Sequence, residues 1–152
     1  MTRNANVFNP LLDLSGLPRF AEIDAAQIEP ALDQTLRECR QKITQIESAC
    51  DHPTWDSVAA KIQDIEEHLE RVWAPVSHLN AVTDSEAFRA AVEVCLPKLS
   101  DFSTELGQNL TLFNGYKKLF RSAEFELLSA AQKKVIKNAI RDFRLSGAEL
   151  QG

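Results

Sequence analysis

The most regular feature of this sequence is a stripe of apolar residues between Trp55 and Val72. Its members follow one another at steps of three, four, three, four and three residues: Trp55, Val58, Ile62, Ile65, Leu69 and Val72. Such steps put every member on one face of an α-helix, which turns once in about 3.6 residues. That face has to be buried against other elements. The stripe therefore predicts an amphipathic helix that begins after Thr54, a favourable N-cap.

Similar stripes occupy the segments on either side of this one. The spacing predicts a first long helix from Asp24 or Gln27 to Ala49. It predicts a third from a cap within residues 83–85 to a stop at Gly107. The three stripes indicate three long helices that share one core.

Each of these helices contains a proline. Pro30 is expected in a first helical turn, where a missing N–H costs nothing. Pro75 and Pro97 fall inside their helices. Because the apolar pattern continues past Pro75 at Val76, Leu79 and Val82, we expect a kinked helix there rather than two helices.

Two shorter helices are predicted in the last third of the chain. Asn109 is suited to cap one, and Ser129 with Gln132 forms a capping box for the other, which stops at residues 146–147. No stretch of useful length shows the alternation of apolar and polar residues that is typical of a β-strand. The predicted fold class is all-α, with about five helices in an antiparallel bundle or array whose long helices are kinked by proline. An extended lead-in, residues 1–23, is expected to pack on a single helical domain, residues 24–152.

Composition and charge exclude several classes of protein. No window reaches the roughly 18 apolar residues of a membrane span, and the N-terminus lacks the apolar core of a signal peptide. We therefore expect a cytoplasmic protein with no membrane partner. Residues 1–108 carry a net charge of −9 and residues 109–152 one of +4, for a total of −5. An acidic chain is not expected to bind nucleic acid. The three cysteines lack CxxC spacing and are expected to stay reduced on helices.

Motifs that carry catalysis are scarce. The sequence contains no GxxxxGK[ST], GxGxxG, GxSxG or HExxH. His68 follows Glu66 and Glu67, but the Glu-x-x-His spacing of di-iron bundles is missing because Ile65 stands three residues earlier. We interpret this segment as a solvated acidic face. No catalytic residue and no metal ligand is predicted in this chain.

Two groups of polar residues could contact a ligand. Ser77, His78 and Asn80 follow Pro75, where they could cap the carbonyl that the proline frees or face a cleft. Lys133, Lys137 and Arg141 form a basic stripe that could hold phosphates. The stripe has few aromatic neighbours and is interrupted by Asp142, so we favour a solvated face.

Two longer segments carry a family resemblance. They are Trp73-Ala74-Pro75-Val76-Ser77-His78-Leu79-Asn80-Ala81-Val82 and AAQKKVIKNAIRDFRLSG at residues 130–147. Shorter segments at residues 9–12 and 96–100 resemble parts of the same family, and they occur in the same order along the chain. Together they resemble the N-terminal region of the thimet-oligopeptidase-like zinc metallopeptidases.

The resemblance implies a part of a much longer, mostly helical enzyme, whose two halves flank a deep channel that admits only short peptides. The zinc motif of that family, HExxH with a downstream glutamate, is absent here. The implied function is a helical domain that walls the channel of a zinc-dependent oligopeptide endopeptidase and is inactive alone. The implied partners are the C-terminal catalytic region of the same polypeptide and short peptides, with zinc in the full-length protein. Candidate channel or interdomain contacts are Ser77, His78, Asn80, Arg141 and Asp142.

An alternative of another class is a free-standing helical interaction module. Such a module would present an apolar groove or the basic stripe to a protein partner.

Overall fold

A computed structural model describes residues 8–151. Its α-helices are α1 (Ala25–Glu47), α2 (Ala60–Val82), α3 (Glu86–Gly107), α4 (Leu110–Phe120), α5 (Ala123–Leu127) and α6 (Ala130–Leu145). Two 3₁₀ turns precede them, η1 (Pro10–Leu12) and η2 (Phe20–Glu22). A π-helical turn, η3 (Trp55–Ala59), leads into α2. A third 3₁₀ turn, η4 (Ala148–Gln151), follows α6. This part of the chain contains no strand, so the all-α prediction is confirmed.

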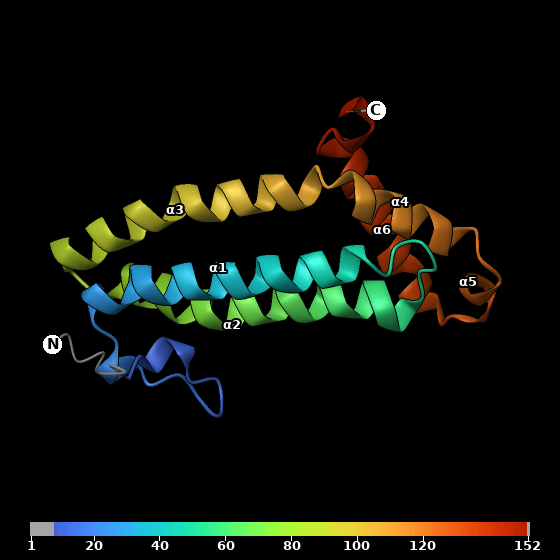
Figure 1. The fold of residues 1–152 in the computed structure, drawn as a ribbon. Helices are drawn as coiled ribbons and strands as arrows, with labels where there is room; N and C mark the ends of the chain where they lie inside the picture. Colours follow the sequence, from blue (N-terminus) through green and yellow to red (C-terminus); the bar gives the residue numbers. More distant parts are fainter. Residues whose placement is uncertain (1–7, 152) are drawn as a thin grey trace, which may run out of the picture.

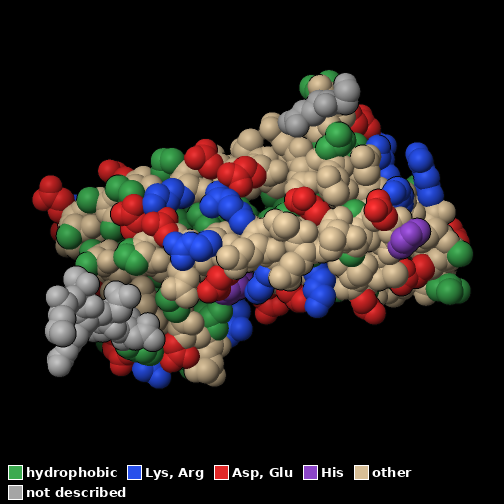
Figure 2. Space-filling model, in the orientation of Figure 1, with side chains coloured by type: hydrophobic (Ala, Val, Ile, Leu, Met, Phe, Trp, Pro, Cys, Tyr) green, Lys and Arg blue, Asp and Glu red, His purple; other side chains and the backbone are tan. Residues whose placement is uncertain are grey.

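The three long helices form an elongated antiparallel array (Figure 1). α1 packs along both α2 and α3, and α4, α5 and α6 gather at the end where α1 stops and α2 begins. η1 contacts α1 and α2 near the opposite end. Between α1 and α3 the surface is hollowed (Figure 2), leaving a cavity of about 190 Å³.

Capping side chains fix where the helices begin. Thr54 Oγ1 accepts the N–H of Ser57 at 3.0 Å, as its predicted capping role requires. Ser129 and Gln132 form the predicted capping box of α6, with bonds of 2.9 and 3.1 Å. Asn109 caps α4 by accepting the N–H of Leu112 at 3.0 Å.

One expectation about a proline was wrong. Asp24, not Gln27, caps α1, because the N–H of Asp24 donates to Gln27 Oε1 at 2.9 Å in a capping box. Pro30 is therefore the sixth helical residue and lies in the second turn, where it removes the bond to the carbonyl of Ala26. Both residues are exposed, so solvent can reach that carbonyl. α2 and α3 continue past Pro75 and Pro97 as predicted.

The core is one cluster of side chains drawn from all six helices. Most of the stripe that begins at Trp55 faces it: Val58, Ile62 and Ile65 are buried in the cluster, and Trp55 and Leu69 are half-buried against it. Val72 is buried too but is not a member of the cluster. Leu11 of η1 and Ala148 of η4 join the same cluster. The arrangement explains why the period of about 3.6 residues was so clear in the sequence.

Two glycines close helices for different reasons. α3 ends at Gly107 as predicted, but Gly107 does not have the positive φ of a left-handed cap. A Cβ there would lie 2.7 Å from Ser146 Oγ, so close helix packing requires the glycine. Gly147, after α6, does adopt a positive φ of 89°.

Candidate functional site

A cavity of about 410 Å³ lies where α2, α3, α4 and α6 meet. We call it the junction cavity. It is lined by Ile62, Gln63, Glu66, Ser103, Leu106, Gly107, Tyr116, Val135, Asn138, Ala139, Asp142, Phe143 and Ser146. Its volume falls in the range of small-molecule sites, roughly 300–1,000 Å³. Its wall combines apolar side chains with a few polar groups, and it includes Asp142, one of the predicted contact residues.

Two carboxylates give the junction cavity its charge. Burial raises the pKa of Glu66, and the neighbouring carboxylate of Asp142 raises it further. Glu66 makes no ion pair or hydrogen bond with any residue from 8 to 151. Asp142 pairs only with its chain neighbour Arg141, at 3.4 Å, with both side chains about two-thirds exposed (64% and 66%). Both carboxylates are exposed to solvent, and only that of Glu66 lacks an ion pair among the described residues.

Tyr116 is the most buried polar residue in the lining of the junction cavity. The residue is 2% exposed, and its ring lies 5.6 Å from that of Phe143. Its hydroxyl makes no hydrogen bond to another described residue, and its oxygen is not among the side-chain atoms that are sealed from solvent without a partner there. Burial and the carboxylate of Glu66 both raise the pKa of this phenol, so it keeps its proton at neutral pH.

The predicted residues near Pro75 lie elsewhere. Ser77 and His78 are exposed, and the His78 ring contacts that of Phe20 with centroids 5.3 Å apart. Asn80 is half-buried, and its Oδ1 is sealed from solvent without a partner among the described residues. None of the three donates to the backbone carbonyl that Pro75 frees, so the structure gives no support to the capping interpretation.

The five predicted contact residues do not form one site. Asp142 lines the junction cavity together with Glu66, whereas Ser77 follows Glu66 by 11 residues on α2. At about 1.5 Å per residue, that separation is roughly 16 Å along the helix. Arg141 does not line the cavity. Two separate surfaces are thus candidates for contacts, one near the end of α2 and one on α6.

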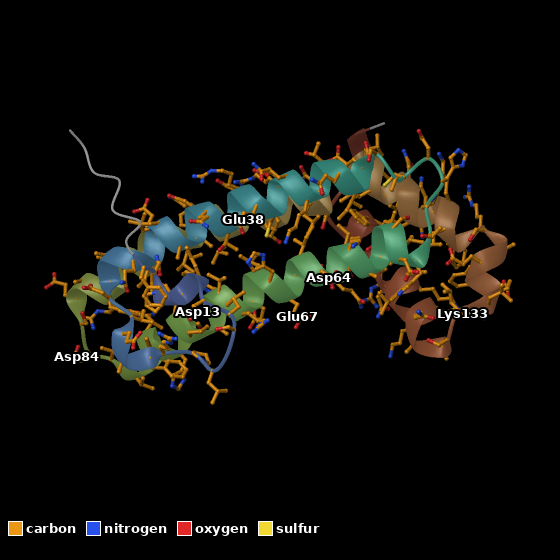
Figure 3. All side chains as sticks on the ribbon, turned by 60° about the horizontal axis from the view of Figure 1, so that its bottom comes forward. Asp13, Glu38, Asp64, Glu67, Asp84 and Lys133 are labelled. Carbon is orange, nitrogen blue, oxygen red and sulfur yellow. The ribbon has the colours of Figure 1, made fainter. Side chains whose placement is uncertain are left out.

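The basic stripe of α6 is partly engaged within the chain. Lys133 Nζ lies 5.6 Å from the ring centroid of Phe125, and Arg141 pairs with Asp142. Figure 3 places Lys133 at one end of the molecule and Asp84 at the other.

The cysteines are free as predicted, but Cys50 lies in the turn after α1 and not on a helix. Cys39, Cys50 and Cys95 are free and buried, and burial raises the pKa of each thiol. Such thiols are poor nucleophiles. Within residues 8–151 no three His, Cys, Asp or Glu side chains come together to hold a metal ion. No helix in the same range has the length and apolarity to span a membrane.

Glu66, Glu67 and Glu70 are exposed, as the predicted solvated acidic face requires, but His68 itself departs from that interpretation. His68 is half-buried, and its Nδ1 is sealed from solvent without a partner in the described chain. Figure 3 shows Glu67 on α2 and Glu38 on the neighbouring α1. Burial lowers the pKa of His68 below 6.5; Lys42 of α1 and Arg71 lower it too, against the opposing effect of Glu38.

This depressed pKa predicts a pH dependence of stability. The unfolded chain binds the proton of His68 more readily than the folded chain, so the stabilisation is present above about pH 6.5. It is lost as the pH falls through the pKa of the folded state. We expect the free energy of unfolding to fall more between pH 7.5 and pH 5 in the unmodified chain than in His68→Gln. Urea unfolding at both pH values measures the two losses, and equal losses would contradict the assignment.

Comparison with known proteins agrees with the resemblance. A family model for the N-terminal domain of neurolysin and thimet oligopeptidase matches residues 32–152. Oligopeptidase A of Haemophilus influenzae is 44% identical over 142 residues, which are 93% of this chain and 21% of that protein. Oligopeptidase A of Escherichia coli is 37% identical over 93% of this chain and 21% of its own length. The probable cytosolic oligopeptidase A of Arabidopsis thaliana is 31% identical over 94% of this chain and 20% of its own length.

The chain thus spans about a fifth of the length of these relatives. The similarity covers nearly the whole chain and includes both long segments from which the resemblance was predicted. We conclude that this chain belongs to the family of neurolysin/thimet oligopeptidase N-terminal domains and is similar to that region of oligopeptidase A.

Proposed function

We propose that this chain acts as the N-terminal helical part of an oligopeptidase A-type zinc endopeptidase, where it forms part of the wall of the substrate channel and limits peptide length. The observation that carries the proposal is the match of 93% of the chain to about a fifth of proteins named oligopeptidase A. A cytoplasmic location goes with this proposal, as one relative is named cytosolic.

The residues described here do not fit a zinc site, because no three potential ligands meet among them. In the proposed enzyme, zinc would be bound by another part of the polypeptide. The role of residues 8–151 would then be positional. They would contribute helices that contact the catalytic part and restrict access to it.

Exposed leucines support such docking. Leu127, Leu145 and Leu150 are 86%, 79% and 89% exposed, although large apolar side chains are costly to leave in water. Leu145 and Leu150 follow each other closely at the end of α6 and in η4. Exposed apolar surface of this kind is typical of contacts with further protein. A free-standing interaction module would use the same surface for a separate protein.

Substitutions in the complete polypeptide test the channel role. We propose Ser77, His78 and Asn80 as one group of channel or interdomain contacts, and Arg141 and Asp142 as a second. Replacing all residues of a group by alanine is expected to change kcat/KM for long peptides relative to kcat/KM for short ones. If the group contacts the catalytic part, the replacement is expected to lower Tm.

The matched control for these variants is Gln45→Ala, an exposed change on α1. It is expected to leave the ratio of kcat/KM values and the Tm unchanged. Unchanged KM, kcat and Tm in both alanine groups would remove those residues from the proposal.

A further inference from the structure

We propose that a groove beneath the loop of residues 13–19 receives an apolar side chain, with a basic residue next to it, from the part of the polypeptide that lies outside this chain. The inference rests on the proposed function, which requires such a part. The groove has a volume of about 400 Å³ and is lined by that loop, η1 and α2. We call it the lead-in groove. Figure 1 shows the loop below α2, in the half of the molecule away from α4 and α6.

Most of the lining of the lead-in groove is apolar. Leu11 and Pro75 are buried, Leu14 and Ile23 are half-buried, and Leu17 is 91% exposed. The groove thus runs from the core to the surface, and no side chain of the described residues fills it, although Leu17 borders it. Water in an apolar space finds few hydrogen-bond partners. The groove is therefore suited to an apolar side chain.

Three interactions hold the loop above the groove. The carboxylate of Asp13 pairs with Arg19 Nη2 at 3.2 Å, which closes the loop at its two ends. The N–H of Ser15 donates to Asp13 Oδ1 at 3.1 Å. Arg71 of α2 donates to the carbonyl oxygen of Leu14 and so ties the loop to the helix. The groove is therefore formed before a partner arrives, which lowers the entropy that binding costs.

Exposed apolar residues surround the lead-in groove. Phe8 and Phe20 are 55% and 41% exposed, so that with Leu17 three large apolar side chains reach solvent within 13 residues. The Phe20 ring contacts that of His78, which follows the groove residue Ala74 by one turn of α2. The groove is thus continuous with the first group of proposed interdomain contacts. An apolar surface of this kind is typical of a contact with further protein.

The charges of the lead-in groove indicate a basic partner. Four charged residues line it. Asp13 pairs with Arg19, and Arg71 is engaged with the backbone of the loop. The fourth, Glu70, is exposed and makes no ion pair with any residue from 8 to 151. A Lys or Arg beside the incoming apolar side chain would complement this carboxylate.

Two further acids extend this negative charge along α2. Asp64 and Glu67 precede Glu70 at steps of three residues, are exposed, and form no ion pair within the described range. Figure 3 shows Asp64, Glu67 and Asp13 in this order along one side of the molecule. About four fifths of the length of each bacterial relative lies outside the match to this chain. In the proposed enzyme, that part is the source of the apolar and basic residues.

Thiol labelling of Leu17→Cys tests the proposal. The three cysteines of the chain are buried, and the mass of the peptide that contains residue 17 reports on the new thiol alone. We expect a maleimide to label it at least about tenfold more slowly in the complete polypeptide than in the 152-residue chain. Gln45→Cys, on the exposed face of α1 and outside the groove, is the matched control and is expected to react equally in both.

Removal of the acids tests the chemistry of the occupant. In the complete polypeptide, Glu67→Gln with Glu70→Gln is expected to speed the labelling of Leu17→Cys severalfold, because the basic residue loses its partners. Glu93→Gln, an exposed change on α3, is expected to leave the rate unchanged. Equal rates in these two backgrounds would contradict a basic residue beside the apolar one.

Other results would overturn the proposal. Equal labelling of Leu17→Cys in the 152-residue chain and the complete polypeptide would mean that the groove stays open. Protection that grows with the concentration of the 152-residue chain would assign the groove to a second copy. Protection of the complete polypeptide only after a basic peptide is added would assign it to a peptide. Labelling does not depend on peptide cleavage, so failure of this interface and failure of the proposed function remain separate results.

Discussion

Replacing Phe113 by alanine is expected to lower the free energy of unfolding by about 3–5 kcal/mol. Phe113 is 0% exposed in α4, and its ring lies 5.6 Å from that of Phe143 in α6. Lys117 Nζ covers the same ring at 4.3 Å from its centroid. The substitution removes these contacts and leaves a cavity between helices that the rest of the core holds apart. Urea unfolding followed by circular dichroism measures the loss.

Phe120→Ala is the matched control for this substitution. Phe120 lies on the same helix but is 40% exposed, and its main aromatic contact is Phe125, at 4.9 Å between centroids. We expect a loss of about 1 kcal/mol, the order of one aromatic pair. Equal losses in the two variants would mean that α4 is not packed on α6 as described.

Replacing Gly115 by alanine is expected to be destabilising by about 1–3 kcal/mol, although alanine is the better helix former by about 1 kcal/mol. Gly115 is buried in α4 where the chain after α1 crosses it. A Cβ at this position would lie 2.7 Å from Cys50 Sγ and 3.0 Å from Cys50 Cβ. Since Cys50 is itself 4% exposed, it has little room to move away. Thermal unfolding at a fixed pH measures the change.

Two further variants separate the clash from other effects. Gly16→Ala places a methyl group where no atom lies within 4 Å, so we expect a change within about 0.5 kcal/mol. Gly115→Ala in a Cys50→Ala background removes the closest contact. The double variant should therefore lose less stability than the sum of the two single losses. Strict additivity would contradict the close approach.

The helices that could be predicted from the sequence are those with long stripes and clear caps. Val58, Ile62 and Ile65 repeat on one face because they share one core, so periodicity alone located α2. α5 is only five residues long and was not predicted, since so short a helix shows no period. It depends on local bonds such as that from the N–H of Phe125 to Ser122 Oγ. Pro30 was misplaced because Asp24 and Gln27 are both plausible starting points for a helix.

The junction cavity could be predicted only in part. Asp142 was singled out as a candidate contact, whereas Glu66 was assigned to a solvated acidic face, and it is exposed as that assignment requires. Tyr116 was not among the residues singled out from the sequence. These three residues meet only because α2, α4 and α6 converge, and the spacing within any one helix carries no trace of that convergence. A similar reason applies to His68, whose burial depends on the position of α1.

Hydrolysis of quenched fluorescent peptides tests the central proposal most directly. The samples, with zinc added, are the 152-residue chain, the separately expressed remainder of its reading frame, and their mixture. We predict that the chain alone cleaves no peptide. We also predict that short peptides are cleaved in preference to long ones only when both parts are present. Cleavage by the chain alone would contradict the account. So would a remainder that, without this chain, discriminates between short and long peptides as well as the mixture does.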